Sequence, residues 1–399
     1  MTEEDDLPKH KKRKRLLWII TAVFLGIGIA GFFYWLFVWR FEESTDDAYV
    51  HGNQVIVTPQ ISGHIISVTV DDTEVVEEGR ILVELNTIDR KMALENTKNT
   101  LAEMVRNVTQ MFENVSMLKA DVEANKAAFA KAGQDYKHRK ALVKSGGVSK
   151  EEFQHSEAFF IEAFANLLSV QYSLRGAQAL VENTTIETHP LVEKAKDDLR
   201  EALVNFVRCT ILSPVHGMVA MKKAQVGESI SPDTPLMMIV PLDQIWVDAN
   251  FKEIQLKKIR IGQPVNLKSD IYGGDMIYHG VVIGIAAATG SVMSVLPPQN
   301  ATGNWIKIVQ RLPVRIKLEP SELKRFPLRL GLSMDVTVDI HDTSGKMIPK
   351  PPPPGALYTT DIFDNQDEGA DAMIKKIIEE NKTFSFDEED DGRAQTSQR

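Results

Sequence analysis

The chain has 399 residues, of which 43% are hydrophobic and 25% charged, and its formal net charge is −9. This length is enough for two or three ordinary domains, and the acidic balance argues against nucleic acid as a partner. With one cysteine, Cys209, the chain can form neither an intramolecular disulfide nor a cysteine-rich metal site.

The first predicted element is an apolar helix over residues 16–39, which carry no charged side chain. Such a helix is long enough to cross the ~30 Å hydrocarbon core of a bilayer, and Trp18, Trp35 and Trp39 suit the two interfaces. A cleaved signal peptide is the alternative. Its apolar region would be shorter and followed by a small-residue cleavage site, which the sequence lacks. We therefore expect an uncleaved transmembrane anchor.

A basic block, KHKKRKR, occupies residues 9–15 immediately before this anchor. The positive-inside rule keeps such a segment in the cytoplasm and exports the other side. We expect residues 1–15 to form a short cytoplasmic tail and everything after Arg40 to be exported.

Two segments, residues 59–85 and 214–240, resemble each other, and Gly63 aligns with Gly217 without a gap. Alternating β-branched residues separated by Gly, Asp and Pro predict short strands and turns. We predict one β-sandwich built from two halves, residues 44–88 and 207–243, with a long insertion between them.

That insertion, residues 89–206, has helical periodicity. Every seventh residue from Leu94 to Val143 is apolar or aromatic, and the spacing resumes from Phe153 to Val181. A strict seven-residue repeat predicts coiled-coil packing, and a short connection makes the two helices antiparallel. Because His189-Pro190 lies in the second helical run, we expect a kink or short break there.

The stretch LVKSGGVSKEEF, residues 142–153, connects the two helices. Gly146 and Gly147 permit positive φ and hence a sharp reversal of the chain. Ser149 and Glu152 have the spacing of a capping box that starts the second helix. We expect this turn to be the exposed tip of the hairpin.

Residues 244–342 contain several strand-like runs separated by Gly and Pro, which predict a small β-barrel. Within them, residues 294–316 are rich in Asn, Trp, Gln and Arg. Two interpretations stay open: a polar loop with Trp305 as a packing anchor, or a docking surface for a membrane partner. The residues of such a docking surface would be Asn300, Asn304, Trp305, Gln310 and Arg311.

The last predicted segment, residues 343–399, begins with a proline-rich stretch and is acidic. DAMIKKII, residues 371–378, allows a short amphipathic helix. We expect most of the segment to be disordered because it is polar and charged.

The complete order of parts is an anchor, a half-sandwich, a helical hairpin, a second half-sandwich and a barrel, which is an α+β chain. The split sandwich is similar to the biotinyl/lipoyl fold. The whole order resembles the periplasmic adaptor proteins, or HlyD-like membrane fusion proteins. Three motifs resemble the EmrA branch of that family in particular: DDAYVHGNQVIVTPQISGHI at 46–65, IWVDANFKEIQL at 245–256 and LPPQNATGNWIKIVQRLPVRI at 296–316.

This resemblance implies a bacterial inner-membrane protein that faces the periplasm. It implies three kinds of partner: a major-facilitator drug exporter in the inner membrane, a TolC-like channel in the outer membrane, and further copies of the chain. The family carries an Arg-x3-Leu-x6-Ser signature at the hairpin tip. Leu142 and Ser149 match it, whereas His138 stands at the arginine position and Arg139 is displaced by one place. The implied tip surface consists of His138, Arg139, Leu142, Gly146, Gly147 and Ser149.

No motif for catalysis stands out, because the histidines lack metal-ligand spacing and there is no phosphate-binding loop. We expect neither enzymatic activity nor a cofactor. Two alternatives stay open: an adaptor for type I protein secretion, and a membrane-tethered carrier or structural tether.

Overall fold

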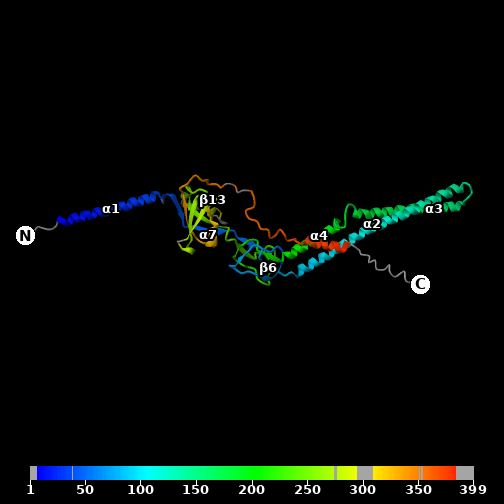
Figure 1. Ribbon diagram of the computed structural model, residues 1–399, viewed down its shortest axis with the longest axis horizontal. Helices are drawn as coiled ribbons and strands as arrows, with labels where there is room; N and C mark the ends of the chain where they lie inside the picture. Colours follow the sequence, from blue (N-terminus) through cyan, green and yellow to red (C-terminus); the bar gives the residue numbers. More distant parts are fainter. Residues whose placement is uncertain are drawn as a thin grey trace, which may run out of the picture.

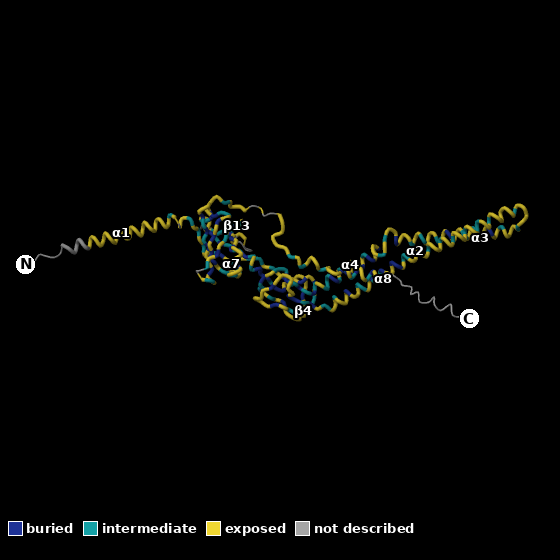
Figure 2. The backbone as a smooth tube through the Cα atoms, viewed as in Figure 1, coloured by how far each residue is buried: buried dark blue, intermediate teal, exposed yellow. Residues whose placement is uncertain are grey.

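The computed structural model describes residues 7–37, 39–273, 276–293, 309–349, 351 and 354–382. The parts of the molecule follow one another along a single long axis (Figure 1). The N-terminal helix lies at one end, two β-rich bodies follow, and a helical hairpin reaches the other end. Figure 2 shows buried residues concentrated in the two β bodies and in the part of the hairpin beside them.

The N-terminal helix α1 spans Leu7–Phe37, and a short 3-10 helix, η1, follows at Trp39–Phe41. Residues 13–41 contain the stretch of the described chain that is long and apolar enough to cross a membrane. Its large side chains, such as Trp18 and Phe24, are exposed because, among the described elements, α1 contacts only the adjoining η1. Helix α1 therefore contains residues 16–37 of the anchor predicted at 16–39, begins earlier, at Leu7 before the basic residues, and ends at Phe37, whereas Trp39 belongs to η1.

The β-sandwich consists of two four-stranded antiparallel sheets, and each sheet takes strands from both halves of the sequence repeat. One sheet has the order β3 (Val55–Val57), β10 (Met237–Val240), β8 (Gly217–Val219) and β5 (Val75–Val76). The other has the order β7 (Thr210–Leu212), β6 (Ile81–Leu85), β4 (Gly63–Val68) and β9 (Ser229–Ile230). Neither half can form its sheets alone, so the predicted split sandwich is confirmed.

The repeat is visible in the core of this sandwich. Equivalent residues of the two halves, such as Ile65 and Val219 or Leu82 and Leu236, are all buried in one apolar cluster. Cys209 lies in the same cluster, where burial raises the pKa of its thiol.

The second β body is a seven-stranded antiparallel sheet whose order along the sheet is β1, β15, β12, β13, β14, β11, β2. The strands are β1 (Glu42–Thr45), β2 (Ala48–Gly52), β11 (Ile245–Lys252), β12 (Pro264–Lys268), β13 (Ile277–Ile285), β14 (Arg311–Leu318) and β15 (Asp335–Asp339). Short helices connect them: α5 (Glu253–Leu256), η2 (Asp270–Tyr272), α6 (Gly290–Met293) and α7 (Pro320–Arg325). The barrel closes through β2, which pairs with β11 on one side and with the residues just before β15 on the other: Val50 N–H donates to the carbonyl of Leu332 and Met334 N–H donates to that of Ala48, both at 2.9 Å. The sheet thus closes into the predicted barrel.

The predicted start of the sandwich at residue 44 is wrong. Strands β1 and β2 pair with β15 and β11 of the barrel, and Ala48 and Val50 are buried in the barrel core. A strand pairs where its apolar face is buried. The barrel partner of β2, strand β11, lies about 200 residues further along the chain, so the local sequence pattern could not identify it.

The hairpin consists of α2 (Ile88–Val143), α3 (Lys150–Val181) and α4 (Pro190–Val207). The predicted interruption is a break over residues 182–189, in which Asn183 has φ +58°. His189 caps α4 by accepting a hydrogen bond from Leu191 N–H, and Pro190 occupies the first turn, where it has no N–H to leave unpaired. The seven-residue seam is confirmed, since Leu94, Leu101 and Val108 are buried.

The C-terminal segment differs from the prediction of general disorder. It runs back from the barrel to the hairpin and ends in helix α8, Ala370–Lys382, beside α2 and α4 (Figure 1). Ala370, Ile374 and Ile378 lie on one face of α8 and are buried. That apolar face, within an otherwise charged sequence, is the reason that the segment docks. Residues 383–399 lie outside the described residues.

Candidate docking surfaces

The tip of the hairpin is a tight turn that depends on one of the two predicted glycines. Gly146 has φ +75°, a value that side chains with a Cβ rarely adopt. Gly147 has no such φ, and its N–H donates to the carbonyl of Leu142 at 3.0 Å. Gly146 makes the reversal, and Gly147 closes the last turn of α2.

A reciprocal cap fixes the start of α3 beside this turn. Ser149 Oγ accepts from Glu152 N–H at 3.1 Å, and the Glu152 carboxylate accepts from Ser149 N–H at 3.0 Å. The bond from Ser149 N–H, together with a bond of 3.1 Å that the Ser149 hydroxyl donates to the same carboxylate, holds the pKa of Glu152 below its ordinary value. Arg139 of α2 donates to the Glu152 carbonyl at 3.3 Å, which links the two arms. The predicted capping box is present.

The remaining predicted tip residues face solvent. His138 is exposed, and Leu142 is about half exposed at 48%. The structure therefore gathers His138, Arg139, Leu142, Gly146, Gly147 and Ser149 around one turn. Four exposed lysines near this turn were not predicted as part of the tip, because the sequence shows them only as separate charges along two helices. They are Lys137, Lys140, Lys144 and Lys150.

At the barrel, two of the five predicted docking residues are described. Arg311, the first residue of β14, forms an ion pair of 2.7 Å with Asp47, which also accepts from Asn250 at 3.1 Å. The carbonyl of Gln310 accepts from Glu253 N–H at 3.3 Å. These contacts tie β14 to β2 and β11. Asn300, Asn304 and Trp305 lie outside the described residues.

A second polar cluster on the same barrel surface was missed by the sequence reasoning. The Arg315 guanidinium lies 4.4 Å from the centroid of the Trp246 ring and 3.1 Å from Asp248, which also accepts from the Trp246 indole at 3.0 Å. Alternating residues of β11 point outward, so the IWVDAN motif already contained this signal.

One side of α3 carries an apolar stripe that stays partly exposed, although the Phe164 ring lies 5.6 Å from the Phe129 ring of α2. Its residues are three to four positions apart, which places them on one face of the helix. Ile161, Phe164 and Tyr172 are each more than half exposed, and Leu168 is 38% exposed. A continuous exposed apolar face on a soluble helix indicates a surface for another protein.

The described residues contain no group of three or more His, Cys, Asp or Glu side chains placed to hold a metal ion. The candidate docking surfaces are thus the hairpin tip, the polar face of the barrel around Arg311 and Arg315, and the apolar stripe of α3.

Comparison with known proteins gives consistent relatives. Residues 88–209 match the family described as "EMRA, alpha-helical hairpin domain". The chain is 41% identical over 369 residues to the multidrug export protein EmrA of Haemophilus influenzae, covering 92% of this chain and 95% of that protein. It is 44% identical over 347 residues to EmrA of Escherichia coli, covering 87% and 89%. Among solved structures, the periplasmic adaptor protein EmrA aligns with 75% of this chain and 99% of its own, at 17% identity and a TM-score of 0.39.

Proposed function

Because this chain belongs to the EmrA family of periplasmic adaptor proteins, we propose that it is the membrane fusion subunit of a multidrug efflux pump. The observation that carries this proposal is the identity above 40% over almost the whole length of the EmrA relatives. The subunit links an inner-membrane exporter of the major-facilitator class to an outer-membrane channel of the TolC type. Its role is assembly and not catalysis.

The linear arrangement of parts supports a bridging role. A membrane-spanning helix and a free hairpin tip lie at opposite ends of the molecule (Figure 1). Helix α2 alone has 56 residues, so it is about 84 Å long at 1.5 Å per residue. Arg13, Lys14 and Arg15 at the start of the apolar span favour a cytoplasmic N-terminus, which directs the hairpin into the periplasm.

The two ends then serve different partners. The tip residues and the lysines around them dock to the channel. The anchor and the barrel surface around Arg311 and Arg315 face the exporter, because they are the parts nearest the membrane. Adjacent copies of the chain pack side by side through the stripe of Ile161, Phe164, Leu168 and Tyr172. That contact would remove an otherwise exposed apolar face from water.

Photo-crosslinking in cells tests the bridge. A photo-reactive residue replaces Lys150, which is exposed at the tip, in the full-length membrane-anchored chain. Capture of an outer-membrane channel is the expected result. The same residue in place of Lys126, which is exposed on the side of α2, is the matched control and should not capture the channel. Capture from position 126 alone, or of inner-membrane proteins alone, would contradict docking by the tip.

Drug tolerance tests the wider role. Removal of the gene from its host should increase sensitivity to several unrelated drugs, and expression of the full chain should restore tolerance. If sensitivity stays unchanged while secretion of a protein is lost, type I secretion becomes the better explanation.

A further inference from the structure

The C-terminal strap, which we define as residues 342–349, 351 and 354–382, touches all three bodies of the exported part. It begins at the barrel, where Gln263 donates to the carbonyl of Asp342 at 2.7 Å and Ile261 N–H donates to that of Lys346 at 3.0 Å. Gly345 lies so close to the barrel that a Cβ there would be 2.6 Å from the Ile261 carbonyl oxygen. The first residues of the strap are therefore fixed to the barrel.

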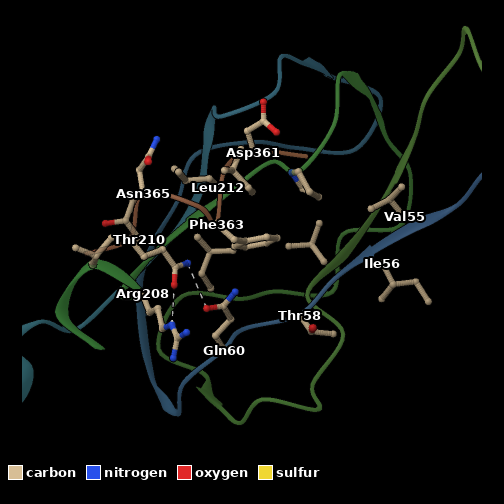
Figure 3. A pocket seen from close by; sticks show the side chains of 16 residues that line it. Val55, Ile56, Thr58, Gln60, Arg208, Thr210, Leu212, Asp361, Phe363 and Asn365 are labelled. Carbon is tan, nitrogen blue, oxygen red and sulfur yellow. Dashed lines mark hydrogen bonds between the residues drawn. The ribbon is translucent and has the colours of Figure 1, made fainter. Parts of the chain in front are cut away.

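The middle of the strap crosses the open side of the sandwich, between edge strands β3 and β7. It lines a cavity of about 490 Å³ there (Figure 3). Gln366 accepts from Arg208 at 3.0 Å and donates to Gln60 at 3.3 Å, and Thr360 donates to Glu78 at 2.8 Å. The Phe363 ring points into the cavity (Figure 3). These contacts hold the strap on its path between barrel and hairpin.

The end of the strap, α8, completes a three-helix base of the hairpin. Ile374 and Ile378 join a buried cluster with residues of α2 and α4, and Ala370 packs with Leu94 and Leu203. The cluster around the two isoleucines contains Leu101, Val105, Val108, Val192, Ala195 and Leu199. Without α8, this apolar groove would lie open between α2 and α4.

The last turn of α8 lies at the break in the second arm of the hairpin. Lys382 forms an ion pair of 3.0 Å with Glu187, which belongs to the break itself, and Arg106 of α2 donates to Asn381 at 2.8 Å. Ile186, also in the break, packs against the same apolar cluster as α8. Helix α8 of the strap thus contacts the second arm of the hairpin at the break between α3 and α4, where the helical hydrogen bonds are interrupted.

We propose that the C-terminal strap is an intramolecular splint, whose terminal helix α8 stiffens the base of the hairpin beside the break and keeps the hairpin in line with the barrel. The reason is mechanical. Two helices in contact can bend or slide along their single seam, whereas a third helix that packs against both adds two more interfaces. This role rests on contacts within one chain and does not depend on the efflux function.

A thiol crosslink tests whether the strap belongs to the same copy as its groove. Arg200 and Asp371 form an ion pair of 2.8 Å across α4 and α8, and both side chains reach solvent. The native Cys209 is replaced by Ala, and Arg200→Cys is combined with Asp371→Cys in the full chain. Because an arginine and an aspartate side chain together hold the two Cβ atoms further apart than a disulfide allows, a short bismaleimide joins the two thiols. We expect a crosslink within the monomer. A covalent dimer, or no crosslink, would overturn the proposal. Arg200→Cys with Lys376→Cys, on the outward face of α8, is the control that should not be bridged.

Amide hydrogen exchange tests the stiffening. The variant Ile374→Asp with Ile378→Asp places charges in the groove, so α8 should leave it. We expect exchange in α4 and in residues 98–112 of α2 to rise at least threefold relative to strand β13 of the barrel. The control Lys376→Ala, on the outward face, should leave these rates unchanged. In the double-cysteine variant, the bismaleimide bridge should slow exchange in the same segments. A rise smaller than threefold in the aspartate variant would overturn the splint.

Discussion

Gly63 and Gly217 occupy equivalent positions in the two halves of the sandwich but tolerate side chains differently. A Cβ on Gly217 would lie 2.7 Å from the carbonyl oxygen of Val240 and 2.8 Å from a methyl of Ile239. A Cβ on Gly63 would approach only the side chain of Leu85, at 3.3 Å. A backbone oxygen in a sheet cannot move aside, whereas the end of a leucine can adjust.

We therefore expect Gly217→Ala to lower the stability of the sandwich by about 2 kcal/mol, in the range of overpacked cores. Gly63→Ala should cost about 1 kcal/mol or less. Amide exchange of β8 and β10 in the full chain measures both free energies. Equal effects of the two variants would mean that the close approach at Gly217 relaxes easily.

The cap at the tip has a defined pH dependence. The pKa of Glu152 is lowered by hydrogen bonds from Ser149, so the charged form is favoured in the folded state. Its contribution is complete above the ordinary pKa of 4.5 and is lost as the pH falls through the lowered value. The amide signal of Glu152, observed by selective ¹⁵N labelling, should shift in that acid window.

Removing the other half of the cap gives a test at neutral pH. Ser149→Ala should destabilise the first turn of α3 by about 1 kcal/mol. Faster amide exchange at residues 150–153 measures the effect, and an unchanged rate would show that the turn holds the helix start without the cap. The neighbouring Lys150→Ala serves as the control.

At the scale of elements, aromatic rings join the two arms of the distal hairpin. Phe160 of α3 stacks on Phe129 at 5.1 Å and on Tyr136 at 5.3 Å between ring centroids. Gly133 makes room for this ring, since a Cβ there would lie 3.3 Å from it. These contacts replace the aliphatic seam found at the base.

Phe160→Ala should destabilise the α2–α3 pairing by about 2 kcal/mol, less than a fully buried phenylalanine because the ring is half-buried. Phe159→Ala is the matched control, since its ring is 69% exposed and should cost little. Exchange rates of the amides in residues 126–140 and 153–167 measure both. Similar losses in the two variants would exclude a special role for the stacked rings.

Local pattern predicted the helices well and the partners of distant strands poorly. The heptad positions, the break before Pro190 and the Ser149 cap all depend on residues close in sequence. The sandwich was predictable because the two halves repeat. The placement of β1 and β2 in the barrel was not, because a short strand gives no sign of which distant edge it joins. For α8, the apolar spacing within residues 371–378 allowed an amphipathic helix, but the polarity of the surrounding segment gave no sign that this helix docks on the hairpin.

At the scale of the whole molecule, the three bodies are connected in two ways: by the chain passing once through each, and by the strap that returns along them. The path of the chain fixes the order of the bodies, and the strap holds their relative orientation. The functions proposed for the anchor and for the hairpin tip thus depend on the strap, although the strap is part of neither.

The β6–β7 pair has a further consequence for how the chain folds. Leu85 N–H donates to the Cys209 carbonyl at 2.8 Å, although 209 − 85 = 124 positions separate them. Closing a flexible loop of that length costs about 4 kcal/mol by the (3/2)RT ln n relation. If the two arms of the hairpin pair first, starting at the glycine turn, each further helical contact closes only a small loop. Strand β6 then lies beside β7 before the two strands pair.

Pulsed amide exchange during refolding should then show protection in α2 and α4 before β6 and β7. Leu101→Ala should delay protection of the strands as well as of the helices. Simultaneous protection from the start would mean that the two strands pair without help from the helices.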